Sequence, residues 1–373
     1  MATALLDELG RGDAVQRAES WRYSRNAIRA LSQLDFAPAA GDAVFDAPLR
    51  EQFEWPQTRG RRLVFVNGRL APALSDLVDA DASVATPTTG VCTLRLGPTA
   101  GLVHLVHVAV PGATATRWQA RLEVEVAAPR ACLVEHQVGA SGADVLGVLD
   151  IGLALAPQAR LEWVSLADLP ATTSLVRRAT VSLARQAQLR STHAVFGGRL
   201  QRLELGVAIR GEQARLESRG VFVLRGREHA DIQLDISHAA RDSACDILWR
   251  GVADQRARAI FHGGITVEPG ADGSDASLSN KNVLLSPHAE IDTKPALVIH
   301  ADEVKAAHGA TVGQIDERAL FYLRSRGIAL AAARRMLVAA FCAEALAGID
   351  DAALRERIEA LAAARLPAPE GAP

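Results

Sequence analysis

The sequence predicts a mainly β protein. Its core is expected to be a right-handed parallel β-helix, or β-solenoid, with N-terminal and C-terminal α-helical domains. From about residue 90 to residue 304, short apolar or alternating runs bounded by Gly, Pro, Asp, Asn or Ser follow one another. No helical window interrupts them, which argues against doubly wound and barrel α/β folds.

So long a segment of short strands is typical of a large sandwich, a propeller or a solenoid. The sequence has no WD or kelch period, and it lacks the strict hexapeptide repeat of left-handed solenoids. Runs of irregular length favour a right-handed solenoid, because its coils vary in length while their strands stack. The expected domains are residues 1–89, 90–313 and 314–373.

The N-terminal part shows helical spacing up to about residue 35. The apolar residues that carry this pattern are Leu5, Leu6, Leu9, Ile28, Leu31 and Leu34. The run 63–66 followed by Asn67-Gly68 predicts a strand and a tight turn. Residues 96–116 contain no Asp, Glu, Lys or Arg, but prolines and alternation predict buried strands rather than a membrane span.

Helical periodicity returns after Gly313. Asp316 and Glu317 are suited to the start of a helix, and Gly327 is suited to its end. A second helix is expected to end at Gly348, and a third is expected from residue 352 to about 365. The apolar stripe of the second helix is Leu330, Ala333, Leu337 and Phe341. Helical ends suit a solenoid, whose terminal coils otherwise expose strand edges and core.

Composition excludes several function classes. The 41 basic residues nearly balance the 43 acidic ones and aromatic content is 4%, which argues against nucleic-acid and anionic-membrane surfaces. The four cysteines form no CxxC pair, so we expect neither a disulfide framework nor a self-contained zinc site. The expected location is the cytoplasm. Walker and dinucleotide-binding motifs, the G-x-S-x-G elbow and H-E-x-x-H are all absent.

Candidate metal ligands gather between residues 229 and 308. They are His229, His238, Cys245, His262, His288, His300 and His308. For most of them, a bond to backbone or water is the better interpretation. His308 is the strongest candidate metal ligand, because Gly309 and Gly313 allow a close backbone approach. Cys245 is most simply a small buried residue, with a thiolate ligand as the alternative.

Polar residues near the predicted end of the strands allow two interpretations. Asp292, Lys294, Asp302, Glu303 and Lys305 are compatible with acid–base catalysis in a polysaccharide-degrading solenoid. Alternating surface charge or an ion-paired interface is the better interpretation. Asn280 and Asn282 are expected to stack as hydrogen-bonding turn residues.

Five segments toward the C-terminus carry a more specific signal. In chain order they are Ser279–Leu285 (SNKNVLL), Ala289–Pro295 (AEIDTKP), Ala301–Lys305 (ADEVK), His308–Gly313 (HGATVG) and Leu320–Gly327 (LFYLRSRG). Together they resemble the SufB/SufD scaffold family of the SUF iron–sulfur cluster assembly system, and its SufD branch in particular. Weaker similarity lies in Arg256–Phe261, Glu19–Ser24 and Val64–Gly68. The SufB branch is disfavoured because Gly309, rather than Glu, follows the histidine.

The resemblance implies a non-catalytic scaffold that pairs with a SufB-like subunit and a SufC-like ATPase. Asp292, Lys294, Asp302 and Lys305 would lie at the scaffold–scaffold interface. The ATPase-docking residues would be Phe321, Tyr322, Leu323, Arg324 and Arg326. ATP hydrolysis is expected in the partner.

His308 would bind iron or a nascent cluster shared with the partner, and no cofactor is expected to bind tightly to the isolated chain. Family members often carry Cys two positions before this histidine, where Ala306 stands here. Sulfur must then come from the partner or from Cys245. A carbohydrate-active solenoid and a purely structural homodimer remain the alternatives.

Overall fold

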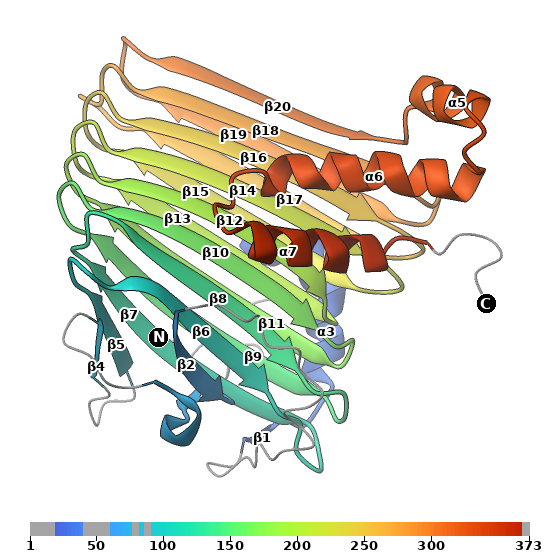
Figure 1. Ribbon diagram of the computed structural model, residues 1–373, viewed down its shortest axis with the longest axis horizontal. Coiled ribbons are helices and arrows are strands. Elements are labelled where there is room, and N and C mark those ends of the chain that lie inside the picture. Colours follow the sequence, from blue (N-terminus) through green and yellow to red (C-terminus); the bar gives the residue numbers. More distant parts are fainter. Residues whose placement is uncertain (1–18, 40–59, 77–81, 86–90, 368–373) are drawn as a thin grey trace.

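The computed structural model describes residues 19–39, 60–76, 82–85 and 91–367. Its centre is a parallel β-solenoid made of two long sheets, with helices near both ends of the chain (Figure 1). The predicted fold class is therefore confirmed. Leu5, Leu6 and Leu9, which carry part of the expected N-terminal helical pattern, lie outside the described residues.

Within the described residues, each sheet contains ten strands. The first sheet, sheet A, consists of β1 (Ala37–Pro38), β4 (Ala82–Ala85), β5 (Val91–Leu96), β7 (Thr116–Val126), β9 (Val145–Leu155), β11 (Thr173–Leu183), β13 (Leu200–Ile209), β15 (His229–His238), β17 (Arg258–Val267) and β19 (Glu290–Ile299). The second, sheet B, consists of β2 (Arg61–Val66), β3 (Arg69–Leu70), β6 (Gly101–Ala109), β8 (Ala131–Gly139), β10 (Arg160–Leu169), β12 (Gln188–Gly197), β14 (Arg215–Leu224), β16 (Ala244–Ala253), β18 (Asp275–Leu284) and β20 (Lys305–Gly313).

From β5 to β20 the chain alternates between the sheets, so each strand pairs in parallel with the strand two places along. Arg160 on β10 lies opposite Gln188 on β12, and Asp275 on β18 lies opposite Lys305 on β20. One coil is therefore 28 residues long between β10 and β12, and 30 residues long between β18 and β20. Residues at the same register stack in columns that run along the solenoid.

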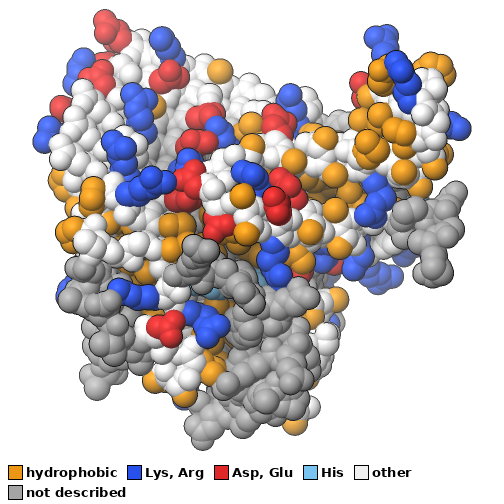
Figure 2. All heavy atoms as spheres, in the orientation of Figure 1, with side chains coloured by type: hydrophobic (Ala, Val, Ile, Leu, Met, Phe, Trp, Pro, Cys, Tyr) orange, Lys and Arg blue, Asp and Glu red, His pale blue; other side chains and the backbone are white. Residues whose placement is uncertain are grey.

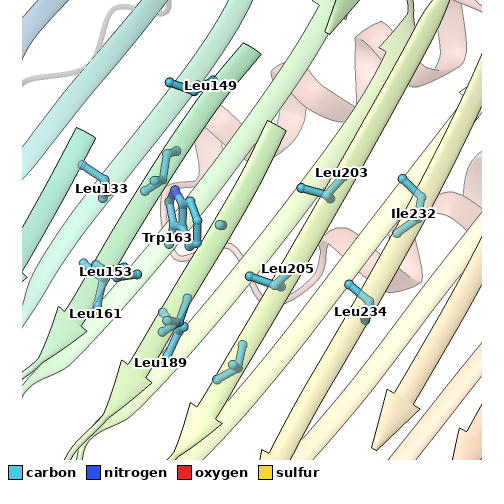
Figure 3. Close-up of a cluster of buried hydrophobic side chains, with 14 of the residues drawn as sticks. Leu133, Leu149, Leu153, Leu161, Trp163, Leu189, Leu203, Leu205, Ile232 and Leu234 are labelled. Atoms are coloured by element: carbon cyan, nitrogen blue, oxygen red, sulfur yellow. The ribbon is translucent and has the colours of Figure 1, made fainter. Parts of the chain in front are cut away.

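The interior of the solenoid is filled by apolar side chains from the facing sheets. Trp163, Leu203 and Ile232 are among the buried residues that point into it (Figure 3). Successive coils add equivalent side chains to the same columns, which gives one continuous core rather than separate ones. Most strand residues between 96 and 116, those from Val103 to Ala109 in particular, are buried in this body, as expected. Among the described residues, no helix has the length and hydropathy of a membrane span.

The predicted turn after residue 66 is confirmed. Strands β2 and β3 form an antiparallel hairpin in which Phe65 lies opposite Leu70. Asn67 and Gly68 connect them with φ values of 45° and 78°. Positive φ at both central residues gives the twist that a two-residue hairpin requires, and Asn-Gly adopts it at low cost.

Helices pack on part of the outer face of each sheet. The helical elements are η1 (Glu19–Ser24), α3 (Arg25–Ser32), η2 (Pro72–Leu74), α5 (Glu317–Ser325), α6 (Leu330–Leu346) and α7 (Ala352–Ala364). Helices α6 and α7 lie across the outer face of sheet B, where Val338 and Ile358 join its valines in an apolar cluster (Figure 1). Helix α3 packs Ile28 and Leu31 against sheet A. The three predicted C-terminal helices are confirmed, and the Asp316 side chain caps α5.

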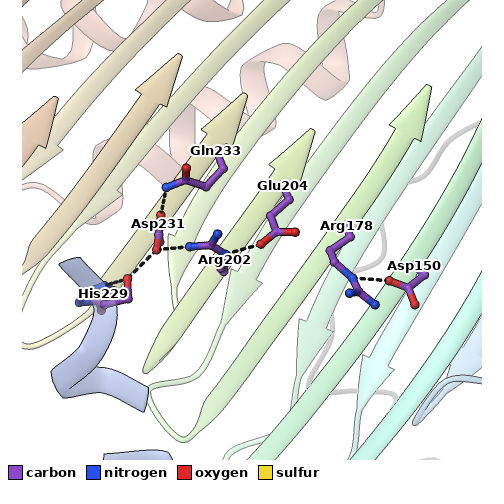
Figure 4. Close-up of polar contacts among 8 residues, drawn as sticks. Asp150, Arg178, Arg202, Glu204, His229, Asp231 and Gln233 are labelled. Atoms are coloured by element: carbon purple, nitrogen blue, oxygen red, sulfur yellow. Dashed lines mark hydrogen bonds and ion pairs between the residues drawn. The ribbon is translucent and has the colours of Figure 1, made fainter. Parts of the chain in front are cut away.

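The N-terminal segment is held on sheet A by a buried polar network (Figure 4). The Ser24 hydroxyl donates a hydrogen bond to Asp231 at 2.6 Å and lies 2.9 Å from Nε2 of His229. Arg202 pairs with Asp231 at 2.6 Å and lies over the Trp21 ring at 3.9 Å. These contacts give the Glu19–Ser24 segment a structural role in anchoring the N-terminal helix.

Candidate functional site

The candidate site is the C-terminal end of the solenoid, formed by β19 and β20. Each is the last strand of its sheet, and no other strand in the described part of the chain pairs with its outer edge. Val298, Ile299 and Val312 are 46%, 43% and 40% exposed there. The corresponding positions of earlier coils are covered by the next coil. This end therefore leaves both backbone hydrogen-bonding groups and apolar side chains available.

His308 belongs to an inward-facing column. It lies opposite Leu278 on β18, which in turn lies opposite Ile247 on β16. Leu278 and Ile247 are buried in the core, whereas His308 is exposed because no further coil covers it. The imidazole thus stands at the open mouth of the solenoid.

No neighbouring atom of this chain requires glycine at the two glycine positions near His308. A Cβ added at Gly309 or Gly313 would meet no atom within 4 Å in this chain. The close backbone approach expected from the sequence is therefore not made by this chain. It remains a prediction for a partner at this face.

Directly below the mouth, the interior becomes polar. Asn280 and Asn282 are buried in the middle of β18, so the expected turn role is wrong. Asn280 accepts hydrogen bonds from Thr293 at 2.8 Å and from Asn282 at 2.6 Å. Asn282 also donates to the Thr311 carbonyl on β20 at 3.1 Å. The sequence pattern missed this because register alone decides which strand residues face inward.

The other predicted interface residues surround the same end. Asp292 on β19 accepts a hydrogen bond from Arg258 at 3.0 Å and is half-buried. Lys294 lies opposite His262 on the neighbouring strand and is exposed. Asp302 and Lys305 are exposed in and after the connection from β19 to β20. The structure places all four on the last coil, and it tests none of them as partner contacts.

Cys245 lies away from His308. Its column runs through Ala276 to Ala306, so a whole coil separates it from the open end, roughly 10 Å at two strand spacings. Its thiol lies 3.1 Å from Nε2 of His238, and burial raises the pKa of Cys245 to about 12. The structure thus does not bring Cys245 and His308 together. Among the described residues, no three His, Cys, Asp or Glu side chains are grouped to hold a metal ion.

The predicted docking helix α5 projects from the solenoid (Figure 1). Phe321 and Tyr322 are 74% and 57% exposed, and hydrophobic and basic side chains mix on this projection (Figure 2). Arg326 donates to the Tyr322 hydroxyl at 3.2 Å, and Arg324 is exposed. Leu323 is half-buried. Exposed aromatic and arginine side chains are typical of protein–protein contacts.

A second polar group lies inside the solenoid, and sequence reasoning missed it. Glu135 on β8 forms a bidentate ion pair with Arg177 on β11 at 2.5 and 2.8 Å, and the Trp163 indole also donates to it. Burial alone would raise the pKa of Glu135, but the Arg177 guanidinium holds it below its usual value. His193, nearby on β12, is also buried, and that burial together with Arg177 keeps its pKa well below the usual range.

Comparison with known proteins identifies the family. A family model described as "SUF system FeS cluster assembly, SufBD core domain" matches residues 114–341, which include the solenoid end and His308. The chain belongs to the SufBD core family. It is 28% identical to the iron–sulfur cluster assembly protein SufD of Escherichia coli, over 95% of this chain and 90% of that protein.

Two further relatives carry the same family description. A SufBD family protein of Synechocystis is 27% identical over 92% of this chain and 85% of its own length. A SufBD family protein of Mycobacterium tuberculosis is 28% identical over 76% of this chain and 68% of its own length. The resemblance seen in the sequence is thereby confirmed at the level of the family.

Proposed function

We propose that this chain is a SufD-type scaffold subunit for iron–sulfur cluster assembly. The open end of its solenoid would pair with a SufB-like scaffold. The observation that carries the proposal is the inward column that ends in His308, exposed where its counterparts are buried. A solenoid end of this kind requires a cap, and the described residues supply none for β19 and β20.

The proposed pairing would complete both the sheets and the metal site. The edges of β19 and β20 would add strands from the partner, and the apolar side chains of the mouth would be buried with them. His308 would then supply one imidazole nitrogen to iron or to a nascent cluster, the cargo of the assembly reaction. Sulfur ligands would come from the partner, since Cys245 is buried a coil away and Ala306 offers none.

The projecting helix α5 would bind a SufC-like ATPase. Phe321 and Tyr322 would provide the buried aromatic anchors of that interface, and Arg324 and Arg326 would lie around them. The chain would itself remain non-catalytic, with ATP hydrolysis in the partner. The cytoplasm is the proposed site of action.

Co-expression with SufB-like and SufC-like partners tests the proposal. The test variant is Val312→Asp, which puts a charge on the inward, exposed side of β20. Its control is Thr311→Asp, one residue away on the outward face and also exposed. We expect the first to abolish co-purification with the SufB-like partner and the second to preserve it, because only the first charge is buried by pairing.

Two results would contradict the proposal. One is co-purification that is equally strong for both variants. The other is a stable homodimer that excludes the partner, which would favour a purely structural assembly. Cleavage of an added polysaccharide would instead support the carbohydrate-active alternative.

A further inference from the structure

A small gap inside the solenoid is lined by several side chains that carry buried polar atoms without a partner among the described residues. Its volume is about 20 Å³, and Gln137, Arg177 and His193 line it together with Val195. Oε1 of Gln137, Nη1 of Arg177 and both ring nitrogens of His193 are buried and have no hydrogen-bond partner among the described residues. These three side chains come from β8, β11 and β12, so both sheets contribute to the gap.

So many unpartnered polar atoms are costly in a protein interior. A buried donor or acceptor that loses water without gaining a partner destabilises the fold, and native proteins keep few of them. The rest of the lining includes apolar side chains, such as Leu175 and Leu203, and three polar ones, Ser165, Gln201 and Arg202. None of these polar side chains forms a hydrogen bond with the four atoms. A bound ligand that forms hydrogen bonds would satisfy one such atom on each of the three side chains.

The gap restricts the ligand by size. A cavity needs roughly 10–15 Å³ to hold one water molecule, so a gap of about 20 Å³ admits one molecule of that size. An organic ligand is too large. The three side chains also match a water molecule in number, since buried waters typically form about three hydrogen bonds and one atom of each side chain can take part.

The charges around the gap further restrict which ligand can bind there. The Arg177 guanidinium already forms a bidentate ion pair with the Glu135 carboxylate, so its positive charge is balanced. Arg202, which also lines the gap, is ion-paired with Glu204 and Asp231. Burial keeps the pKa of His193 well below its usual range, and its imidazole is therefore neutral. A neutral site favours water over an anion or a cation.

We infer that the solenoid interior contains a binding site for one ordered water molecule, held by Gln137, Arg177 and His193. The water accepts a hydrogen bond from Nη1 of Arg177. It donates to Oε1 of Gln137 and to the unprotonated ring nitrogen of His193. One molecule would thereby link three strands across the two sheets.

A high-resolution crystal structure tests the inference directly. We expect density for one water within hydrogen-bonding distance of Arg177 and His193. An empty gap would overturn the inference. So would an anomalous peak at this position after a bromide soak, because a neutral site should exclude the anion.

Thermal unfolding of Val195→Ile gives an independent test. The added methylene fills the gap, so a dry gap predicts a higher Tm. A hydrated gap predicts a lower Tm, because the displaced water leaves its partners unsatisfied. Val103→Ile is the control, since Val103 is also buried in the core of the solenoid but does not line the gap. The inference requires Val195→Ile to lower the Tm more than the control, and a rise in Tm would refute it.

Discussion

The ion pair between Glu135 and Arg177 allows a demanding test of the solenoid interior. Their side chains are 0% and 5% exposed, and the guanidinium donates two hydrogen bonds to the carboxylate. Arg177→Met keeps most of the volume but removes the charge. It leaves the carboxylate of Glu135 buried with the Trp163 indole and Gln137 as its hydrogen-bond donors.

Breaking a buried pair in this way typically costs about 3–5 kcal/mol of unfolding free energy. Removing both charges with Glu135→Gln and Arg177→Met should cost less, because no unpaired charge then stays inside. Urea denaturation followed by circular dichroism measures both losses. The wild type should have the highest urea midpoint, the double variant a lower one, and Arg177→Met the lowest.

The pH dependence of Arg177→Met supplies a second criterion. Without the guanidinium, burial should raise the folded-state pKa of Glu135 above its unfolded value of roughly 4.3. The folded state then binds more protons than the unfolded state. The variant should therefore regain part of its lost stability as the pH falls through that raised pKa. The claim that Glu135 is charged in the folded protein would be refuted if the single and double variants lost equal unfolding free energy and Arg177→Met regained none at low pH.

Three further predictions concern other parts of the molecule. Burial lowers the pKa of His104 to about 4 and that of His136 to about 3. The unfolded state, whose histidines have a pKa of roughly 6.5, therefore binds more protons than the folded state as the pH falls below that value. The urea midpoint should fall between pH 7 and pH 4, and a midpoint that does not change over this range would contradict the prediction. Ser24→Ala should weaken attachment of the N-terminal helix by roughly 1.5–3 kcal/mol, because it removes a donor to the buried Asp231 carboxylate, and faster hydrogen exchange confined to this helix would show it. Phe321→Ala should reduce SufC-like ATPase binding at least tenfold by calorimetry while the midpoint of the isolated chain stays unchanged, since this side chain is 74% exposed.

The fold could be predicted from local signals because they agree with one another. Short strands bounded by turn residues fill the middle of the chain, and the Asn67-Gly68 turn and the Asp316 cap depend only on neighbouring residues. The stacking of coils was expected from the absence of helices between strands. The side of each strand that faces inward could not be predicted. Helices α6 and α7 bury the outer face of sheet B as well, so apolar residues lie on both sides of its strands.

The candidate site could be predicted only in part for the same reason. His308 was recognisable from its flanking sequence, but its place in an inward column depends on the register between β18 and β20. The polar layer of Asn280 and Asn282 likewise depends on that register. The contact between Ser24 and Asp231 joins residues 207 positions apart, a separation that no local pattern encodes.

The central claim is that His308 supplies a ligand at the mouth of a solenoid that a partner completes. The most direct test is the iron and sulfide content of the complex purified with SufB-like and SufC-like partners. We predict that His308→Ala leaves the complex assembled but lowers both contents at least several-fold. The control His288→Ala, an exposed histidine in the turn before β19, should leave them unchanged. Wild-type iron and sulfide in an intact His308→Ala complex would contradict the account.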